Sequence, residues 1–157
     1  MKKMTQQNRK PYAFNGWENP AIRPVDLQFA AIESQHELYD LLSSLWCRNT
    51  CAPRMQDEWS PENKTKGQCS ITAFLAQDIF GGDVCGIPLP DGNFHCYNVI
   101  GDVWFDLTSE QFEEKAKDFD YSSNPVQSRK QHFSKAEKKA RYEMLKHALI
   151  RSLEECR

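Results

Sequence analysis

Residues 67–108 read GQCSITAFLAQDIFGG (67–82), DVCGIPLPDGNFHCYNVI (83–100) and GDVWFDLT (101–108). In the first of these segments, Ile71, Phe74, Leu75 and Ile79 recur at the spacing of one helical face. The Gly81-Gly82 pair that follows supplies the left-handed backbone conformation with which helices commonly end. The sequence therefore predicts a helix that begins next to Cys69 and stops at the two glycines.

Three short strands follow this helix. We expect them at 83–87, 94–100 and 103–107, because each apolar run is bounded by turn-forming residues. Residues 88–93 form the first turn, and Gly101-Asp102 is typical of a two-residue hairpin loop. A helix followed by a three-stranded antiparallel meander is an α+β fold.

Capping signals outside this segment predict flanking helices. Ser34 with Glu37, Thr108 with Gln111, and Ser134 with Glu137 all have capping-box spacing. They predict helices at about 34–48, from 108 to about 117, and from 134 towards the end of the chain. Residues 1–24 are polar and broken by prolines, so we expect an irregular arm that Tyr12, Phe14 and Trp17 attach to the body.

Length and composition favour a single soluble domain. The chain has 157 residues, of which 39% are hydrophobic and 27% charged, and these figures are ordinary for a globular protein. We predict one domain over 1–157, with the arm at 1–24, a core at 34–120 and a helical segment at 130–157. The apolar runs are too short to cross a membrane and the first residues lack a signal-peptide core, so we expect a cytoplasmic protein without membrane partners.

The net charge of −2 hides an asymmetry along the chain. Residues 56–120 contain four basic and thirteen acidic side chains, whereas residues 129–157 contain nine basic and four acidic ones. An acidic middle segment is a poor surface for nucleic acid. It weakly favours a neutral or cationic substrate, and the basic end is typical of a solvated helix face.

The six cysteines fit reduced thiols better than a disulfide framework, because the chain is long enough to form a core and we expect it to be cytoplasmic. They are Cys47, Cys51, Cys69, Cys85, Cys96 and Cys156. Cys69 stands out among them because it lies at the start of a predicted helix. The helix dipole and free N–H groups at such a position stabilise a thiolate.

The hairpin register places a histidine near a carboxylate. With Gly101-Asp102 as the loop, Val99 faces Trp104, Tyr97 faces Asp106 and His95 faces Thr108. Side chains alternate between faces, so His95 lies diagonally beside Asp106 on one face. A Cys69 nucleophile, a His95 base and an orienting Asp106 are the groups that acyl transfer requires, and Gln68 is a possible oxyanion donor.

Each of these residues has a simpler interpretation. Cys69 fits a packing thiol, His95 a hydrogen-bonded strand residue, and Asp106 a cap for the helix that follows it. A different class of site would join Cys47 and Cys51 with His95 and Cys96 around zinc, although neighbouring strand residues point to opposite faces. A third class is a binding module that uses the same polar cluster without turnover. We expect neither a metal nor a cofactor.

The segment 38–115 resembles the YunG-type family of small bacterial proteins. The resemblance rests on motifs in a fixed order, namely Trp59-Ser60-Pro61, Gly67-Gln68-Cys69, His95-Cys96-Tyr97-Asn98 and Phe105-Asp106-Leu107-Thr108. The order Cys, His, Asp is similar to that of papain-like and transglutaminase-like enzymes. The resemblance implies such a core, with Cys69 as nucleophile, His95 as base and acid, and Asp106 as its orienter.

The same resemblance implies that Tyr97 and Asn98 flank the site, with Trp59 and Gln68 also lining it. Gln68 stands directly before the cysteine, unlike the corresponding glutamine of papain-like enzymes. The expected activity is hydrolysis or acyl transfer at an amide bond of a small molecule or peptide, through a thioester on Cys69.

Overall fold

The computed structural model describes residues 11–155. The α-helices are α1 (Gln35–Ser43), α2 (Cys69–Phe80), α3 (Arg129–His132) and α4 (Ala136–Glu155). The strands are β1 (Asp83–Pro88), β2 (Phe94–Ile100) and β3 (Val103–Phe105). The 3-10 segments are η2 (Leu27–Phe29), η3 (Arg48–Thr50), η4 (Pro53–Glu58) and η5 (Ser109–Asp118). The mixed α+β class is therefore confirmed.

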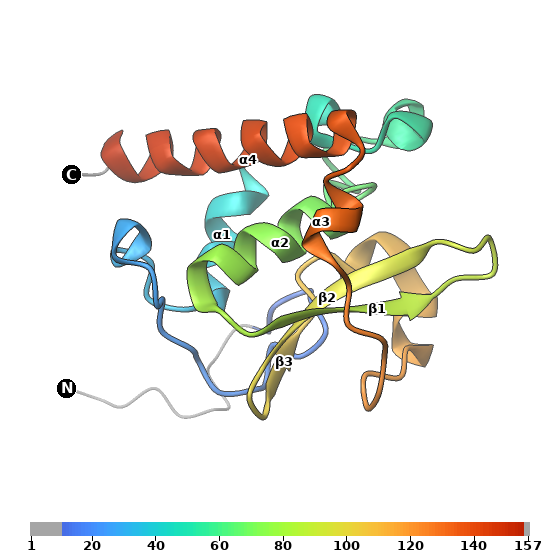
Figure 1. The fold of residues 1–157 in the computed structure, drawn as a ribbon, viewed down its shortest axis with the longest axis horizontal. Coiled ribbons are helices and arrows are strands. Elements are labelled where there is room, and N and C mark those ends of the chain that lie inside the picture. Colours follow the sequence, from blue (N-terminus) through green and yellow to red (C-terminus); the bar gives the residue numbers. More distant parts are fainter. Residues whose placement is uncertain (1–10, 156–157) are drawn as a thin grey trace.

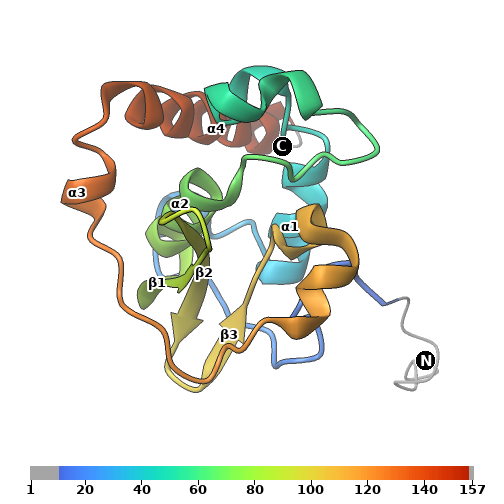
Figure 2. The same ribbon diagram turned by 90° about the vertical axis from the view of Figure 1, so that its right-hand side faces the viewer.

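Helix α2 lies at the centre of the molecule. It packs between the sheet on one side and α4 on the other (Figures 1 and 2). Nine of its twelve residues are buried, because a helix covered on two sides has little polar face left. It ends as predicted at Gly81, whose φ is 80° and whose N–H bonds to the Gln77 carbonyl. The first residue of this enclosed helix is Cys69.

The sheet has the predicted antiparallel order β1-β2-β3. The pairs Ile100–Val103 and Val99–Trp104 confirm the predicted hairpin register. The third strand ends at Phe105 rather than at residue 107, so the expected pairing of Tyr97 with Asp106 and of His95 with Thr108 does not form. The half of β2 that carries His95 consequently has no strand on its β3 side.

The early end of β3 has a local cause. The backbone N–H of Asp106 bonds to the Asn15 carbonyl at 2.9 Å, so the arm replaces β2 as its partner. The described part of the arm packs as expected, and Phe14 is 1% exposed in the same core as α1 and α2. The arm thus takes part in placing Asp106.

Other elements differ from the prediction in their ends and type. Helix α1 has the expected Ser34 cap but stops at Ser43 instead of 48, and η5 is a kinked 3-10 segment in which Thr108 makes no side-chain cap. Glu113 has a φ of 54° at that kink. Helix α4 begins at Ala136, two residues after the predicted Ser134, and the short α3 before it was not predicted.

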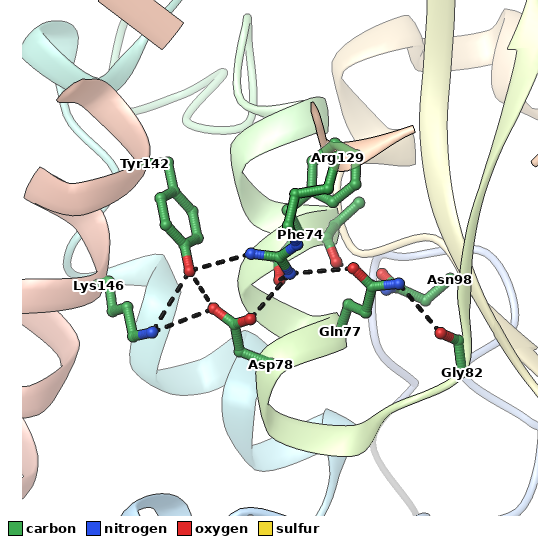
Figure 3. A network of polar contacts seen from close by, with 9 residues as sticks. Phe74, Gln77, Asp78, Gly82, Asn98, Arg129, Tyr142 and Lys146 are labelled. Atoms are coloured by element: carbon green, nitrogen blue, oxygen red, sulfur yellow. Dashed lines mark hydrogen bonds and ion pairs between the residues drawn. The ribbon is translucent and has the colours of Figure 1, made fainter. Parts of the chain in front are cut away.

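A polar network holds α3 and α4 against α2 (Figure 3). Arg129 Nη2 donates to the Phe74 carbonyl at 2.9 Å, to Gln77 Oε1 at 2.9 Å and to Asp78 Oδ1 at 2.8 Å. The other oxygen of Asp78 accepts hydrogen bonds from the Tyr142 hydroxyl and from Lys146 at 3.2 Å. The network therefore fixes the segment that leads into α4.

Replacing Arg129 with alanine should lower the free energy of unfolding by about 1–3 kcal/mol, because Asp78 and a helix carbonyl lose a charged donor. Urea denaturation would measure the loss. Arg151→Ala is the matched control, since Arg151 is an exposed arginine of α4 and its loss should change stability by less than about 0.5 kcal/mol. Equal effects of the two substitutions would contradict a special role for the network.

None of the helices between residues 11 and 155 combines the length and apolar character needed to cross a bilayer.

Candidate active site

A groove of about 800 Å³ opens at the N-terminal end of α2. Its lining comes from η4, the start of α2, the turn before β2, η5, the segment before α3, and the first turns of α4. Cys69 and His95 both contribute to its wall. Segments far apart in the sequence therefore meet around the residue that the sequence singles out.

A tight turn presents Cys69 to this groove. Gly67 has a φ of 69°, and a Cβ atom at this position would lie 2.5 Å from Cys51 Sγ and 2.9 Å from the Ala52 nitrogen. Glycine is therefore needed both for the backbone conformation and for the close approach. Cys69 follows as the first helical residue and is half-buried, so it lies at the positive end of the helix dipole.

His95 is fixed within the groove wall. Its side chain is fully buried, and Nε2 is 2.7 Å from Asp106 Oδ2. The ring packs edge-on against Phe112 and nearly parallel to Phe119, with centroid distances of 4.7 and 5.5 Å. Nδ1 has no well-aligned hydrogen bond among residues 11–155, which leaves this nitrogen available on the side of the ring opposite Asp106.

Asp106 is positioned by groups that the sequence did not reveal. Tyr121 donates its hydroxyl proton to Asp106 Oδ2 at 2.6 Å, and Asn15 Nδ2 donates to the Tyr121 oxygen at 2.9 Å. Asp106 is fully buried, so the carboxylate depends on these donors and on His95. The diagonal contact between His95 and Asp106 forms as predicted, although Asp106 lies just past the end of β3 and pairs with Asn15 rather than with a longer β2–β3 ladder.

The charges in this cluster favour a thiolate–imidazolium pair. Hydrogen bonding from the Cys96 thiol, together with contact with His95 and its charge, holds the pKa of Cys69 well below its usual value despite burial. Burial acts to lower the pKa of His95, but Asp106 and Cys69 outweigh it and raise that pKa to about 10. At pH values above the lowered pKa of Cys69 and below the raised pKa of His95, Cys69 is a thiolate and His95 is charged.

Cys96 is a second unpredicted member of the site. It is 2% exposed on β2, and hydrogen bonding to Cys69 and burial both raise its pKa well above the usual value. The Cys96 thiol therefore stays protonated and donates a hydrogen bond to the Cys69 thiolate. Its backbone N–H also contributes to the lowered pKa of Cys69, which is consistent with the open edge of β2 at this point.

The four residues predicted to line the site lie elsewhere. Gln68 is buried and donates to the Cys47 carbonyl at 3.1 Å, Trp59 donates to the Lys64 carbonyl at 2.9 Å, and Asn98 donates to the Ala73 carbonyl at 2.8 Å. Tyr97 packs on the sheet face opposite α2, where Asn124 donates to its hydroxyl. None of the four lines the groove, because each satisfies a structural hydrogen bond instead.

The zinc alternative finds no geometric support within residues 11–155. No three His, Cys, Asp or Glu side chains in that range are arranged so that they could hold one metal ion. The five described cysteines are free thiols, and Cys156 lies outside the described residues.

Comparison with known proteins identifies the family. A family model described as "YunG protein" matches residues 34–154, which is more than half of the chain. The chain belongs to the YunG family. The "Uncharacterized protein YunG" of Bacillus subtilis (strain 168) is 37% identical over 79 residues, a match that covers 50% of this chain and 63% of that relative. No solved structure matches the chain.

The YunG match includes most of the candidate site. Cys69, His95 and Asp106 fall inside the matched range, and so do Cys96 and Tyr121. Asn15, which holds the Tyr121 hydroxyl and the Asp106 backbone, lies in the arm before the matched range. The arm therefore completes a site whose other members lie in the YunG region.

Proposed function

We propose that the protein is a cysteine-dependent hydrolase or acyltransferase that cleaves an amide or related acyl bond through a thioester on Cys69. The observation that carries this proposal is the His95 ring, which bonds a buried carboxylate through Nε2 and lies beside the half-buried Cys69, with its Nδ1 on the side away from that carboxylate. The order of helix cysteine, strand histidine and following aspartate supports a core of the papain-like or transglutaminase-like kind.

In the first half of the reaction, the Cys69 thiolate attacks the carbonyl carbon of the acyl group. A C–S bond forms and the carbonyl π electrons move to oxygen, where the free N–H groups at the start of α2 stabilise the oxyanion. When the oxyanion collapses, the C–N bond breaks and the leaving amine takes the proton from His95 Nδ1. The products of this half are a thioester on Cys69 and a neutral imidazole.

In the second half, His95 acts as the base. It takes a proton from water or from an acceptor amine as that nucleophile attacks the thioester carbonyl. The C–S bond then breaks, which releases the acyl product and restores the thiolate and the imidazolium. Asp106 and Tyr121 hold the ring orientation through both halves, because Asp106 Oδ2 binds the ring and the phenol together.

Acylation of Cys69 tests the proposal directly. The protein should be incubated near pH 6 with a panel of acyl amides and activated acyl esters, and its intact mass and modified residue determined. We expect a transient acyl adduct at Cys69 that decays with release of acid. Cys47→Ala is the matched control because Cys47 is also a half-buried thiol but lies outside the groove, and it should acylate like the wild type.

Two results would contradict the proposal. In one, Cys69 is acylated no faster than Cys47. In the other, an adduct forms on Cys69 but persists unchanged in the presence of water and amine acceptors, which would favour a binding module with a reactive thiol over an enzyme.

A further inference from the structure

We propose that the groove recognises substrates with an anionic group, such as a carboxylate, beside the scissile acyl bond, and that the Lys138 ammonium binds this group. The inference rests on the proposed function, since it names the substrate class for the same groove. It follows from the arrangement of charges on the α4 side of the groove.

Lys138 faces the groove without a carboxylate partner. It lies in the first turn of α4, is half-buried, and lines the groove together with Cys69. Among residues 11–155, its amino group forms no ion pair with Asp or Glu, and its polar contact is His132 Nδ1 at 3.0 Å. Apart from the nearby Cys69 thiolate, no anionic side chain among residues 11–155 pairs with this partly desolvated ammonium. An unpaired ammonium is costly to bury, so this position favours an anion from outside the chain.

His132 fixes the amino group in place. Burial, followed by the charge of Lys138, lowers the pKa of His132 to about 4, so the ring is neutral at pH 7. Its Nδ1 therefore accepts from Lys138, while Nε2 donates to Gln127 Oε1 at 3.0 Å. An ammonium has three N–H donors and His132 uses one, which leaves two oriented donors for a ligand.

The other charged groups of the groove add to this positive field. Glu137 lines the groove and is bound to Arg141 at 2.8 Å, and Arg54 in the groove wall pairs with Asp91 at 3.5 Å, so these charges are matched within the chain. Lys135 also lines the groove and forms no ion pair within the described residues. The groove therefore carries net positive charge once its internal pairs are counted.

This arrangement reverses the expectation drawn from the acidic middle segment. Along the chain, Cys69 falls within the net-acidic segment 56–120. However, α4 packs across α2 (Figure 1), and basic residues of its first turns line the groove. The wall also carries exposed apolar side chains, with Phe94 39% and Val126 63% exposed. An acyl compound that has both an apolar portion and a carboxylate fits these two sides.

Two alkylating reagents of nearly equal size test the proposal without requiring turnover. Iodoacetate is anionic and iodoacetamide is neutral, so the ratio of their rate constants at Cys69 reports the local field and cancels the thiolate fraction. We expect this ratio to exceed that of free cysteine in low salt near pH 7. Lys138→Met should lower the ratio by about three- to tenfold, and added salt should lower it in the wild type.

Lys139→Met is the matched control, because it removes the same charge from an exposed position on α4 that does not line the groove. It should leave the ratio unchanged. If Lys138→Met does not fold, Lys138→Gln retains a polar side chain of similar length, and Lys138→Glu should invert the preference.

A wild-type ratio equal to that of free cysteine would overturn the proposal. So would a Lys138 substitution that slows both reagents equally, because Lys138 would then only stabilise the Cys69 thiolate. The test separates this inference from the proposed function. A raised ratio without acyl turnover would support anion recognition and contradict the proposed enzymatic function. Acyl turnover with a ratio equal to that of free cysteine would support the enzymatic function and contradict anion recognition.

Discussion

Replacing His95 with alanine should slow the alkylation of Cys69 by iodoacetamide near pH 6 by about ten- to a hundredfold. The imidazole charge and contact are among the causes that hold the Cys69 pKa low. Without them the thiol returns towards an ordinary pKa of about 8.5, and its thiolate fraction at pH 6 falls steeply. The higher nucleophilicity of the more basic thiolate offsets part of this loss.

The pH profile of Cys69 alkylation tests the thiolate–imidazolium pair more directly than a rate at one pH. Wild-type reactivity should rise at low pH, through the lowered pKa of Cys69, and then stay level through neutral pH. Acyl turnover should fall as the pH rises through about 10, because His95 loses the proton that it gives to the leaving group. In the variant, the alkylation curve should move to higher pH.

A second variant separates the loss of the His95 charge from a loss of folding. His95→Gln retains a buried donor for Asp106 but carries no charge, so it should show the same upward shift of the Cys69 pKa with a smaller loss of stability. Cys47→Ala should leave the Cys69 profile unchanged. If either His95 variant alkylates with the wild-type pH profile, the thiolate–imidazolium pair does not exist and the proposed mechanism fails.

The local parts of this site could be predicted from the sequence because short-range rules determine them. The helix stop at Gly81, the two-residue hairpin and the diagonal placement of His95 and Asp106 all depend on residues close together in the chain. The start of α2 at Cys69 depends likewise on the turn at Gly67.

The supporting groups could not be predicted because they come from distant segments. Tyr121 reaches Asp106 only after the kinked η5 reverses the chain, and Lys138 reaches the groove only because α4 packs across α2. A motif records the order of residues, whereas these contacts depend on how helices pack. The same reason explains why Gln68, adjacent to the nucleophile in sequence, turns inward to the Cys47 carbonyl.

Substituting Asp106 by alanine should lower the free energy of unfolding by about 3–5 kcal/mol at pH 7, because it leaves the His95 charge buried without its partner. The Tyr121 hydroxyl would lose its acceptor as well. Asp106→Asn keeps the shape and one acceptor, so it should cost less, about 1–3 kcal/mol. Asp102→Asn in the exposed hairpin loop is the matched control and should be nearly neutral. Urea denaturation at fixed pH would measure all three.

The pH dependence of stability identifies the cause of this loss. The pKa of His95 in the folded protein is raised to about 10, above the value of about 6.5 expected in the unfolded chain. The unfolded state therefore releases this proton first, and the stabilisation is complete below about pH 6.5 and disappears as the pH rises through about 10. Removing the Asp106 charge should flatten this decline, so the stability difference between wild type and Asp106→Asn should shrink from pH 7 to pH 10. A difference that stays constant over this range would mean that Asp106 stabilises the fold through hydrogen bonds alone and that His95 is uncharged in the native protein.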